Sequence, residues 1–382
     1  MKITKFFALM CAAAVAFVGC EGTEDNNNGG TTGGGNNNPP ASTTGFVLSV
    51  DKTPIALGES FTLTVTDDGV DVTSSATIYN YKSMEVVKNN TFTPESTGVY
   101  SFFATLGSKS SNTLYVTVMA SVPDLPADTD AANTKFNHRI LLVDHTGVNC
   151  GYCPMMTDNL LALHETEWKD HFNEVTNHAG AYASGDPANS PAANIVDAFY
   201  GSPGSKPKLN INFYYGEVPN QYVSGFISDM NTVFTELVKV DGADAGAAVA
   251  TVGDPEIVYA TVAVKAAVEQ EYKVNAWLLQ NNIYSANQAN ASEPHHYIYN
   301  HAVRNIAGSP TKTNVQGESI GVVKAGDTFE TGFELPITST KWELDNLEVL
   351  VIISAKDRQN RWEVVNTTVC PVNQSVNFEY LQ

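Results

Sequence analysis

The sequence predicts a multidomain α+β protein, in which a central α/β domain lies between two antiparallel β-sandwiches. Short alternating apolar runs recur from Phe46 to Val118 and again from Ala247 to Gln382, as in antiparallel sheets. Between these two regions, strand-like apolar runs alternate with amphipathic helix-like segments. A chain of 382 residues is also long for one core, which indicates two or three domains.

The N-terminus has the features of an export signal. Lys2 and Lys5 precede an apolar run, Phe6 to Gly19, that is too short to span a membrane as a mature helix. The run ends in FVGC, close to a lipobox, where a signal peptidase cuts before a cysteine that receives lipid. We therefore predict a lipoprotein signal peptide over residues 1–19 and lipidation of Cys20. An ordinary signal peptide cut elsewhere is the alternative.

Residues 20–45 are predicted to be a flexible tether, because they are rich in Gly and Asn and cannot bury enough surface to fold. The acidic start, EGTED, resembles the signal by which Bacteroidetes send lipoproteins to the outer face of the outer membrane. This resemblance implies a lipid-anchored outer-membrane protein that faces the cell surface. The net charge of −20 argues against nucleic acid and anionic membrane surfaces as partners, so membrane contact is expected through the lipid only.

Residues 46–119 predict an antiparallel sandwich, with the runs FVLSV, SFTLTV, VYSFFATL and TLYVTV separated by turns. The stretches SVDKTPIALGESFTLTV and FTPESTGVYSFFATLG resemble bacterial immunoglobulin-like modules, which need no inter-sheet disulfide. The resemblance implies an N-terminal Ig-like β-sandwich, most often a spacer. A Pro- and Asp-rich linker is predicted over residues 120–135.

Residues 136–246 mix two kinds of segment. RILLVDHT and EVTNHAGAY are typical of strands, whereas PMMTDNLLALHETEWKDHF and QYVSGFISDMNTVFTELVKV have the periodicity of amphipathic helices. This alternation predicts an α/β domain. Residues 247–382 return to strand patterns such as IVYATVAVKAAV and LEVLVIISAKD, and they predict a C-terminal antiparallel β-sandwich.

The cysteines can form a redox pair, half of a metal site or a structural staple. Cys11 leaves with the signal and Cys20 carries lipid, so Cys150, Cys153 and Cys370 remain. One close pair and one spare thiol do not make a disulfide-stapled scaffold. A structural zinc site usually needs two close pairs of N or S ligands, and the chain has one such cysteine pair.

The histidines do not complete a metal site either, so we predict none. EPHHYIYNH has the spacing of no usual zinc finger, and His164, His171 and His178 recur every seven residues without a partner motif. His164 and His171 are expected to share a helix face. The remaining histidines of interest lie in EPHHYIYNH and are His295, His296 and His301.

The redox interpretation needs a cysteine at the first turn of a helix, where free N–H groups and the helix dipole stabilise a thiolate. The strand ILLVD runs into a short loop and then into a helix predicted to begin near Cys150. Pro154 is tolerated in a first turn, where its missing N–H has no cost. The local pattern therefore favours a redox-active Cys150–Cys153 disulfide.

With CGYC after ILLVDHT, residues 136–246 resemble a thioredoxin-fold domain, and CGYC is similar to the active site of periplasmic disulfide isomerases. This resemblance implies that Asp144, six residues before Cys150, is a buried proton acceptor for Cys153. Asn149 stands where thioredoxins have tryptophan, a departure that concerns the redox potential and the docking of substrate.

The thioredoxin resemblance also implies a cis-proline that faces the cysteines and precedes a strand. SKPKLNINFYY fits this description and assigns the role to Pro207, with Lys206 presenting the adjacent backbone. Pro203 is a second candidate.

Taken whole, residues from Phe136 to the end resemble the Bacteroidetes outer-membrane lipoproteins related to the 28-kilodalton outer-membrane protein. TGVNCGYCP and YIYNHAVRNIAG carry the likeness, which implies a thioredoxin-like core joined to a C-terminal β-domain. We expect thiol–disulfide exchange without a cofactor, with protein or peptide thiols and disulfides as partners. Cys150 would attack and Cys153 would resolve. The alternative is a non-catalytic surface binding or adhesion lipoprotein that uses the fold as a scaffold.

Overall fold

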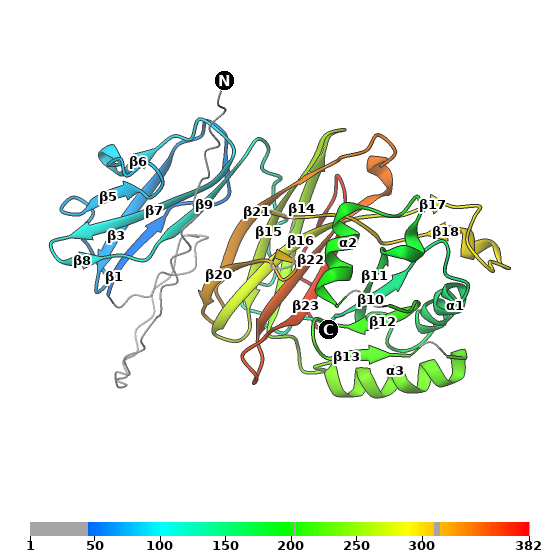
Figure 1. The fold of residues 1–382 in the computed structure, drawn as a ribbon. Coiled ribbons are helices and arrows are strands. Elements are labelled where there is room, and N and C mark those ends of the chain that lie inside the picture. The colour runs from blue at the N-terminus through cyan, green and yellow to red at the C-terminus, as the bar shows by residue number, and fades with distance from the viewer. Residues whose placement is uncertain (1–44, 202–203, 220, 309–313, 382) are drawn as a thin grey trace, which may run out of the picture. The chain divides into compact units, whose positions relative to one another are not determined.

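The computed structural model describes residues 45–201, 204–219, 221–308 and 314–381. The predicted signal peptide, Cys20, most of the predicted tether and Pro203 lie outside the described residues. The described chain has three α-helices, α1 (Cys153–Leu163), α2 (Pro191–Phe199) and α3 (Val223–Leu237) (Figure 1). Its short 3-10 helices are η1 (Lys88–Asn90), η2 (Ala181–Ala183), η3 (Pro294–Tyr297) and η5 (Leu344–Asn346).

The N-terminal strands form two small sheets around one core. Phe61, Leu63 and Val65 alternate with more exposed residues, as expected for a strand with one buried face. The first sheet contains β1 (Phe46–Val50), β3 (Phe61–Asp67), β4 (Val70–Asp71) and β6 (Thr91–Phe92). The second contains β2 (Ile55–Ala56), β5 (Thr77–Asn80), β7 (Gly98–Leu106), β8 (Lys109–Ser110) and β9 (Leu114–Met119). The Ig-like assignment and the domain boundaries stay predictions.

A nine-stranded mixed sheet positions the cysteine pair. Its order is β13-β12-β10-β11-β19-β16-β22-β23, and β20 pairs with β16. Strands β10 and β11 are parallel, and β11 is parallel to β19. The strands are β10 (Ile140–Thr146), β11 (Phe172–His178), β12 (Lys208–Ile211), β13 (Gly216–Val218), β16 (Gln270–Gln280), β19 (Ala302–Ile306), β20 (Glu318–Val323), β22 (Leu347–Lys356) and β23 (Trp362–Pro371).

The predicted fold class is wrong, because the residues that the structure describes form no separate central thioredoxin-like α/β domain. The described chain is mainly β, and the strands predicted for that domain continue into strands of the C-terminal region. At the junction, Thr176 of β11 pairs with Ala302 of β19. The apolar side chains of both regions also form one cluster, in which Val143 and Val175 pack with Trp277. Strands of the C-terminal region thus cover both the hydrogen-bonding edge of β11 and the apolar side chains of β10 and β11.

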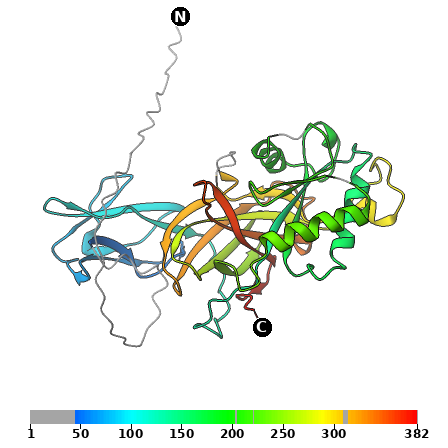
Figure 2. The same cartoon turned by 90° about the horizontal axis from the view of Figure 1, so that it is seen from below.

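Helices cover both faces of the sheet around β10, so all seven residues of this strand are buried. Ile140 and Leu142 pack in the cluster that includes α1 and α3. Leu141 and Val143 point to the opposite face and pack in the cluster that includes α2. Figure 2 shows α2 and the long α3 on different sides of the sheet.

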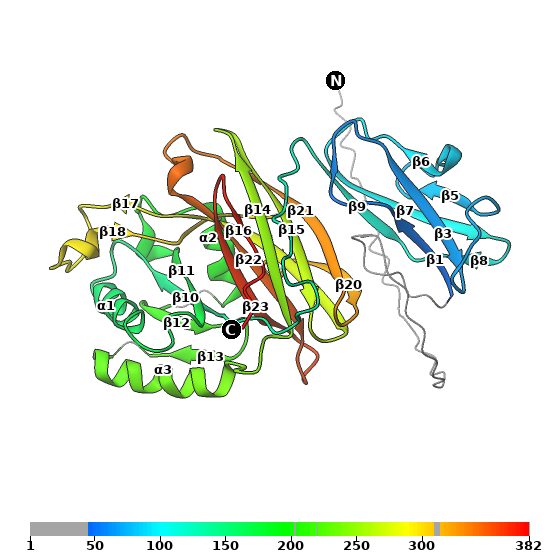
Figure 3. The same ribbon diagram turned by 180° about the vertical axis from the view of Figure 1, so that it is seen from behind.

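The other half of the nine-stranded sheet packs against a four-stranded sheet, with a large aliphatic core between them. The second sheet has the order β21-β15-β14-β24, and β14, β15 and β21 are seen side by side from behind (Figure 3). Its strands are β14 (Ala245–Gly253), β15 (Ile257–Ala266), β21 (Thr328–Pro336) and β24 (Ser375–Val376). A small hairpin, β17 (Ile283–Tyr284) with β18 (Ile298–Tyr299), extends toward α1.

Candidate active site

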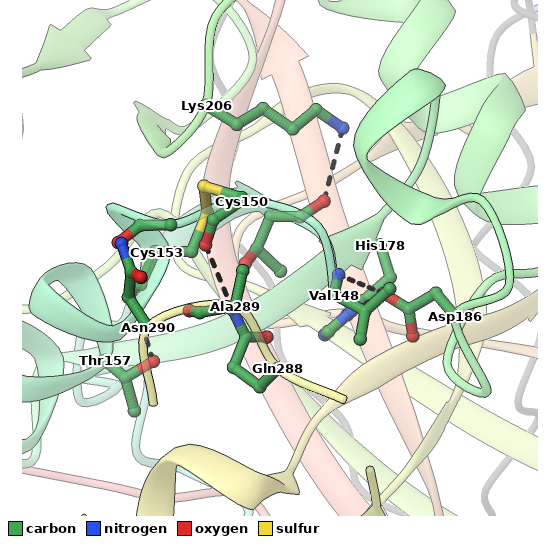
Figure 4. Close-up of a disulfide and its surroundings, with 12 residues drawn as sticks. Val148, Cys150, Cys153, Thr157, His178, Asp186, Lys206, Gln288, Ala289 and Asn290 are labelled. Atoms are coloured by element: carbon green, nitrogen blue, oxygen red, sulfur yellow. Dashed lines mark hydrogen bonds and ion pairs between the residues drawn. A yellow bond between two sulfur atoms is a disulfide. The ribbon is translucent and has the colours of Figure 1, made fainter. Parts of the chain in front are cut away.

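Cys150 and Cys153 form a disulfide in the turn between β10 and α1 (Figure 4). Their Cα atoms are 5.4 Å apart. Both cysteines are buried, with 1% and 2% of their surface exposed, whereas Tyr152 between them is 73% exposed. The loop therefore presents a tyrosine ring to solvent and keeps both sulfurs beneath it.

The helix begins later than the sequence predicted, at Cys153 instead of near Cys150. The Cys153 N–H donates to the Cys150 carbonyl oxygen at 3.3 Å, and the Cys150 N–H donates to the Gly147 carbonyl oxygen at 2.9 Å. Pro154 follows in the first turn, where a missing N–H is tolerated. Cys150 thus lies just before the helix, and its neighbours in the loop contribute to its environment alongside the helix dipole.

Asp144 is buried in β10, the strand that leads into this loop. It lies on the same face of β10 as Leu142, the face that α1 and α3 cover. Asp144 is 3% exposed, and within the described chain no hydrogen bond reaches its Oδ1. Burial, reinforced by the negative charge of Glu174 and opposed by Lys206, raises the pKa of Asp144 to about 8. A carboxyl with this pKa can exchange a proton with a thiol near neutral pH.

Pro207 follows a cis peptide bond with Lys206, as the thioredoxin resemblance implied. Lys206 is buried and its ammonium group is 3.1 Å from Asp197 Oδ1. The same group donates to the carbonyl oxygens of Ala179 at 2.5 Å and Thr146 at 3.4 Å. Because Thr146 ends β10, Lys206 ties the Pro207 segment to the strand that leads to the disulfide.

A groove of about 520 Å³ joins the Pro207 segment to the cysteine loop. Tyr152 and Met155 line it on the cysteine side, and Pro207 lines it on the other. The groove is thus a place where an extended chain can lie against Tyr152, in the loop that carries the disulfide. Its full lining is Tyr152, Met155, Ser205, Lys206, Pro207, Lys208, Glu217, Val218 and Pro219.

Sequence reasoning missed three residues that touch the cysteine loop. Gln288 and Asn290 donate side-chain hydrogen bonds to the carbonyl oxygens of Cys150 and Gly151, and the Ala289 N–H donates to Val148 (Figure 4). They lie almost 140 residues further along the chain, in the segment SANQAN, whose composition indicates only a turn.

Asp158, His295 and His296 place three ligand-type atoms within 4.8 Å of one another. Asp158 Oδ1 is 2.7 Å from His295 Nε2 and 2.9 Å from His296 Nε2. However, His296 Nδ1 accepts N–H groups from Ser292 and Glu293, each at 3.2 Å, so the proton of a neutral ring sits on Nε2. A metal-binding Nε2 requires the opposite tautomer. The cluster fits a hydrogen-bonded contact between α1 and the β17–β18 hairpin better than it fits a metal.

The other histidines have separate partners. The predicted helix face shared by His164 and His171 does not form, since α1 ends at Leu163 and His171 precedes β11. His178 Nδ1 is 2.8 Å from Asp186 Oδ2, and His301 Nδ1 is 2.6 Å from Glu348 Oε1.

Cys370 is fully buried in β23, where its sulfur lies 3.9 Å from Thr251 Oγ1. Burial raises the pKa of the Cys370 thiol. It is the free cysteine of the described chain and a poor nucleophile.

Comparison of the sequence with protein-family models finds a match in the C-terminal region. Residues 247–375 match the family model of outer membrane protein Omp28. Over these residues the chain is similar to the Omp28 family. The description of this family as an outer membrane protein agrees with the predicted location at the outer membrane. Within the described residues, no helix is long and apolar enough to cross a membrane.

Solved structures give a more distant likeness. HBP35 of Porphyromonas gingivalis is 17% identical, with a TM-score of 0.51, and the match covers 65% of this chain and 78% of that one. A domain of the outer membrane lipoprotein Omp28 from Porphyromonas gingivalis is 12% identical, with a TM-score of 0.23, over 34% of this chain and 89% of that one. At these identities the likeness to HBP35 concerns the fold alone. No curated protein matches the chain.

Proposed function

We propose that this Omp28-related lipoprotein carries out thiol–disulfide exchange through Cys150 and Cys153. The observation that carries the proposal is the disulfide itself, which lies at the start of α1 and follows the strand that holds the buried Asp144, whose pKa is raised to about 8. A proton acceptor with a pKa near that of a thiol is what the second half of an exchange reaction needs. The groove between Tyr152 and Pro207 supplies room for a protein or peptide substrate.

In the reducing direction, the Cys150 thiolate attacks one sulfur of a substrate disulfide. The substrate S–S bond breaks, a Cys150–substrate bond forms, and one substrate thiolate leaves. Cys153 then gives its proton to the Asp144 carboxylate and attacks the Cys150 sulfur, which releases the second substrate thiolate. The substrate gains two electrons and the protein returns to its Cys150–Cys153 disulfide. The oxidising direction reverses the same steps, and neither direction needs a bound cofactor.

Anchoring follows from the predicted lipidation of Cys20. A lipid on Cys20 and the tether of residues 20–45 would hold the exchange site near the membrane and let it reach partners at the cell surface.

One observation favours a second candidate, a non-catalytic surface-binding lipoprotein. Both cysteines are almost fully buried and their loop is held by Gln288 and Asn290, as suits a structural disulfide. In that case the disulfide would only stabilise the surface around the groove.

A trapping experiment separates the two functions. Cys153→Ser should accumulate mixed disulfides with partner proteins, because the resolving thiol is missing, and Cys150→Ser should trap nothing. In the reduced wild type, iodoacetamide should modify Cys150 before Cys153. Cys370→Ser is the matched control and should behave as wild type. Absence of trapped species in Cys153→Ser, together with equal alkylation of Cys150 and Cys153, would leave the binding function as the better account.

A further inference from the structure

The disulfide loop is capped by a distant segment, Gln288 to Asn290. The Gln288 side-chain N–H lies 3.0 Å from the Cys150 carbonyl oxygen, and the Asn290 side-chain N–H lies 3.1 Å from that of Gly151. The backbone N–H of Ala289 donates to the Val148 carbonyl oxygen at 2.8 Å. Figure 4 shows the amide of Gln288 directed at Cys150. Three successive residues therefore donate to carbonyl oxygens of one short loop.

Gln288 supplies a donor that the helix itself lacks. In an α-helix the carbonyl of one residue accepts the N–H four residues later, and for Cys150 that residue is Pro154, which has no N–H. The side-chain amide of Gln288 donates to the Cys150 carbonyl oxygen in place of this missing N–H. Gly151 leaves room for the side chain of Asn290, since a Cβ at position 151 would lie 2.6 Å from Asn290 Nδ2.

The orientation of Gln288 is fixed by a second contact. Its Oε1 accepts the Tyr299 hydroxyl at 2.8 Å, and both side chains are buried. The Tyr299 ring packs on the His178 ring, with centroids 4.3 Å apart.

The contacts continue from His178 back to the loop. Asp186 Oδ2 is 2.8 Å from His178 Nδ1 and also accepts the Val148 N–H at 2.7 Å. A closed circuit of contacts thus runs from the loop to Gln288, then through Tyr299 and His178, and back to the loop. The amide nitrogen of Gln288 is thereby held toward Cys150.

We propose that Gln288 is a positioning residue that makes the Cys150 thiolate more reactive. A carbonyl oxygen carries partial negative charge, and that of Cys150 belongs to the same residue as the thiolate. Two N–H donors, from Gln288 and Cys153, offset this charge and fix the loop in which the thiolate forms. The inference rests on the proposed exchange function and names a residue from the Omp28-matching region as part of its site.

The test measures the alkylation rate of Cys150 against pH in the reduced full-length protein. Gln288→Leu keeps the size and removes the donor, so the rate near pH 7 should fall by roughly three- to tenfold and the thiol pKa should rise. Gln288→Glu should cause a larger loss, because it replaces a donor with an anion. Tyr299→Phe keeps the ring and frees the amide, so it should cause a smaller loss in the same direction.

Gln316 provides the control, since its side-chain N–H also donates to a backbone carbonyl oxygen, that of Trp362 at 2.9 Å. Gln316→Leu should leave the Cys150 profile unchanged. If folded Gln288→Glu and Tyr299→Phe proteins both alkylate at the wild-type rate, the inference is overturned, even if Gln288→Leu does not fold. A wild-type Cys150 that titrates like a free thiol would refute the exchange function instead, while the shift caused by each variant relative to wild type would still decide the role of Gln288.

Discussion

Replacement of Asp144 by asparagine tests the buried acid directly. Burial raises its pKa from 3.8 to about 8, which corresponds to about 6 kcal/mol of destabilisation once the carboxyl is ionised, an upper limit at about 1.36 kcal/mol per pH unit. Below pH 3.8 the carboxyl is protonated in both the folded and unfolded states, so this penalty is absent. It grows as the pH rises and is complete above pH 8, so wild-type stability falls through this window.

The Asp144→Asn variant lacks the ionisation penalty but buries an unpaired amide, at a cost of about 1 to 3 kcal/mol that does not depend on pH. It should therefore be somewhat less stable than wild type at pH 4 and more stable, by about 3 to 5 kcal/mol, at pH 9. The same variant should slow exchange, because Cys153 loses its proton acceptor.

Denaturant unfolding with the disulfide intact, at several pH values between 4 and 9, measures this difference. The contributions of the other titrating groups to the unfolding free energy cancel in this difference, because both proteins contain them. The exposed Asp241→Asn, which also removes one carboxyl, serves as the matched surface control. If the difference in unfolding free energy between Asp144→Asn and wild type varies by less than about 1 kcal/mol over this range, burial does not raise the pKa of the Asp144 carboxyl and the reasoning fails.

Three further outcomes are expected. Cys20→Ala should release the protein from membranes or leave its signal uncut, and unchanged fractionation and mature mass would contradict lipidation. Mass spectrometry of the oxidised protein should show Cys150 joined to Cys153 and a free Cys370, whereas a native bridge to Cys370 would refute the assignment. Excess Zn²⁺ should leave the Tm unchanged, since the tautomer of His296 disfavours a ligand at Nε2, and a rise in Tm that His295→Asn abolishes would show otherwise.

Local features of the fold were predictable because they depend on neighbouring residues. The apolar run at Ile140 specifies a buried strand, and the periodicity of Phe226, Met230 and Phe234 specifies the buried face of α3. Helix α2 went unpredicted although its start carries a signal, with Ser190 as N-cap accepting the Ala193 N–H before Pro191.

The error in fold class came from contacts between distant residues. Parallel strands are not joined by a tight turn that would identify the pairing partner in the sequence. Nothing in EVTNHAGAY therefore indicates that β11 pairs with β19, more than a hundred residues later. The cysteine spacing indicated the Cys150–Cys153 pair as the candidate site, but it could not identify Gln288 or Asn290. Their role depends on the path of the β17–β18 hairpin, which no local pattern specifies.

The sheet that runs from β13 to β23 limits how this protein can be divided or reused. A fragment of residues 136–246 would contain Asp144, CGYC and Pro207, yet it would end at β11 with an open hydrogen-bonding edge. Val143 and Val175 would lose Trp277, and the Cys150 carbonyl would lose the amide of Gln288. Such a fragment would be prone to aggregate and would have a differently tuned thiol. The smallest portion that keeps this site intact therefore runs from Phe136 to Tyr380, whose backbone pairs with Phe136.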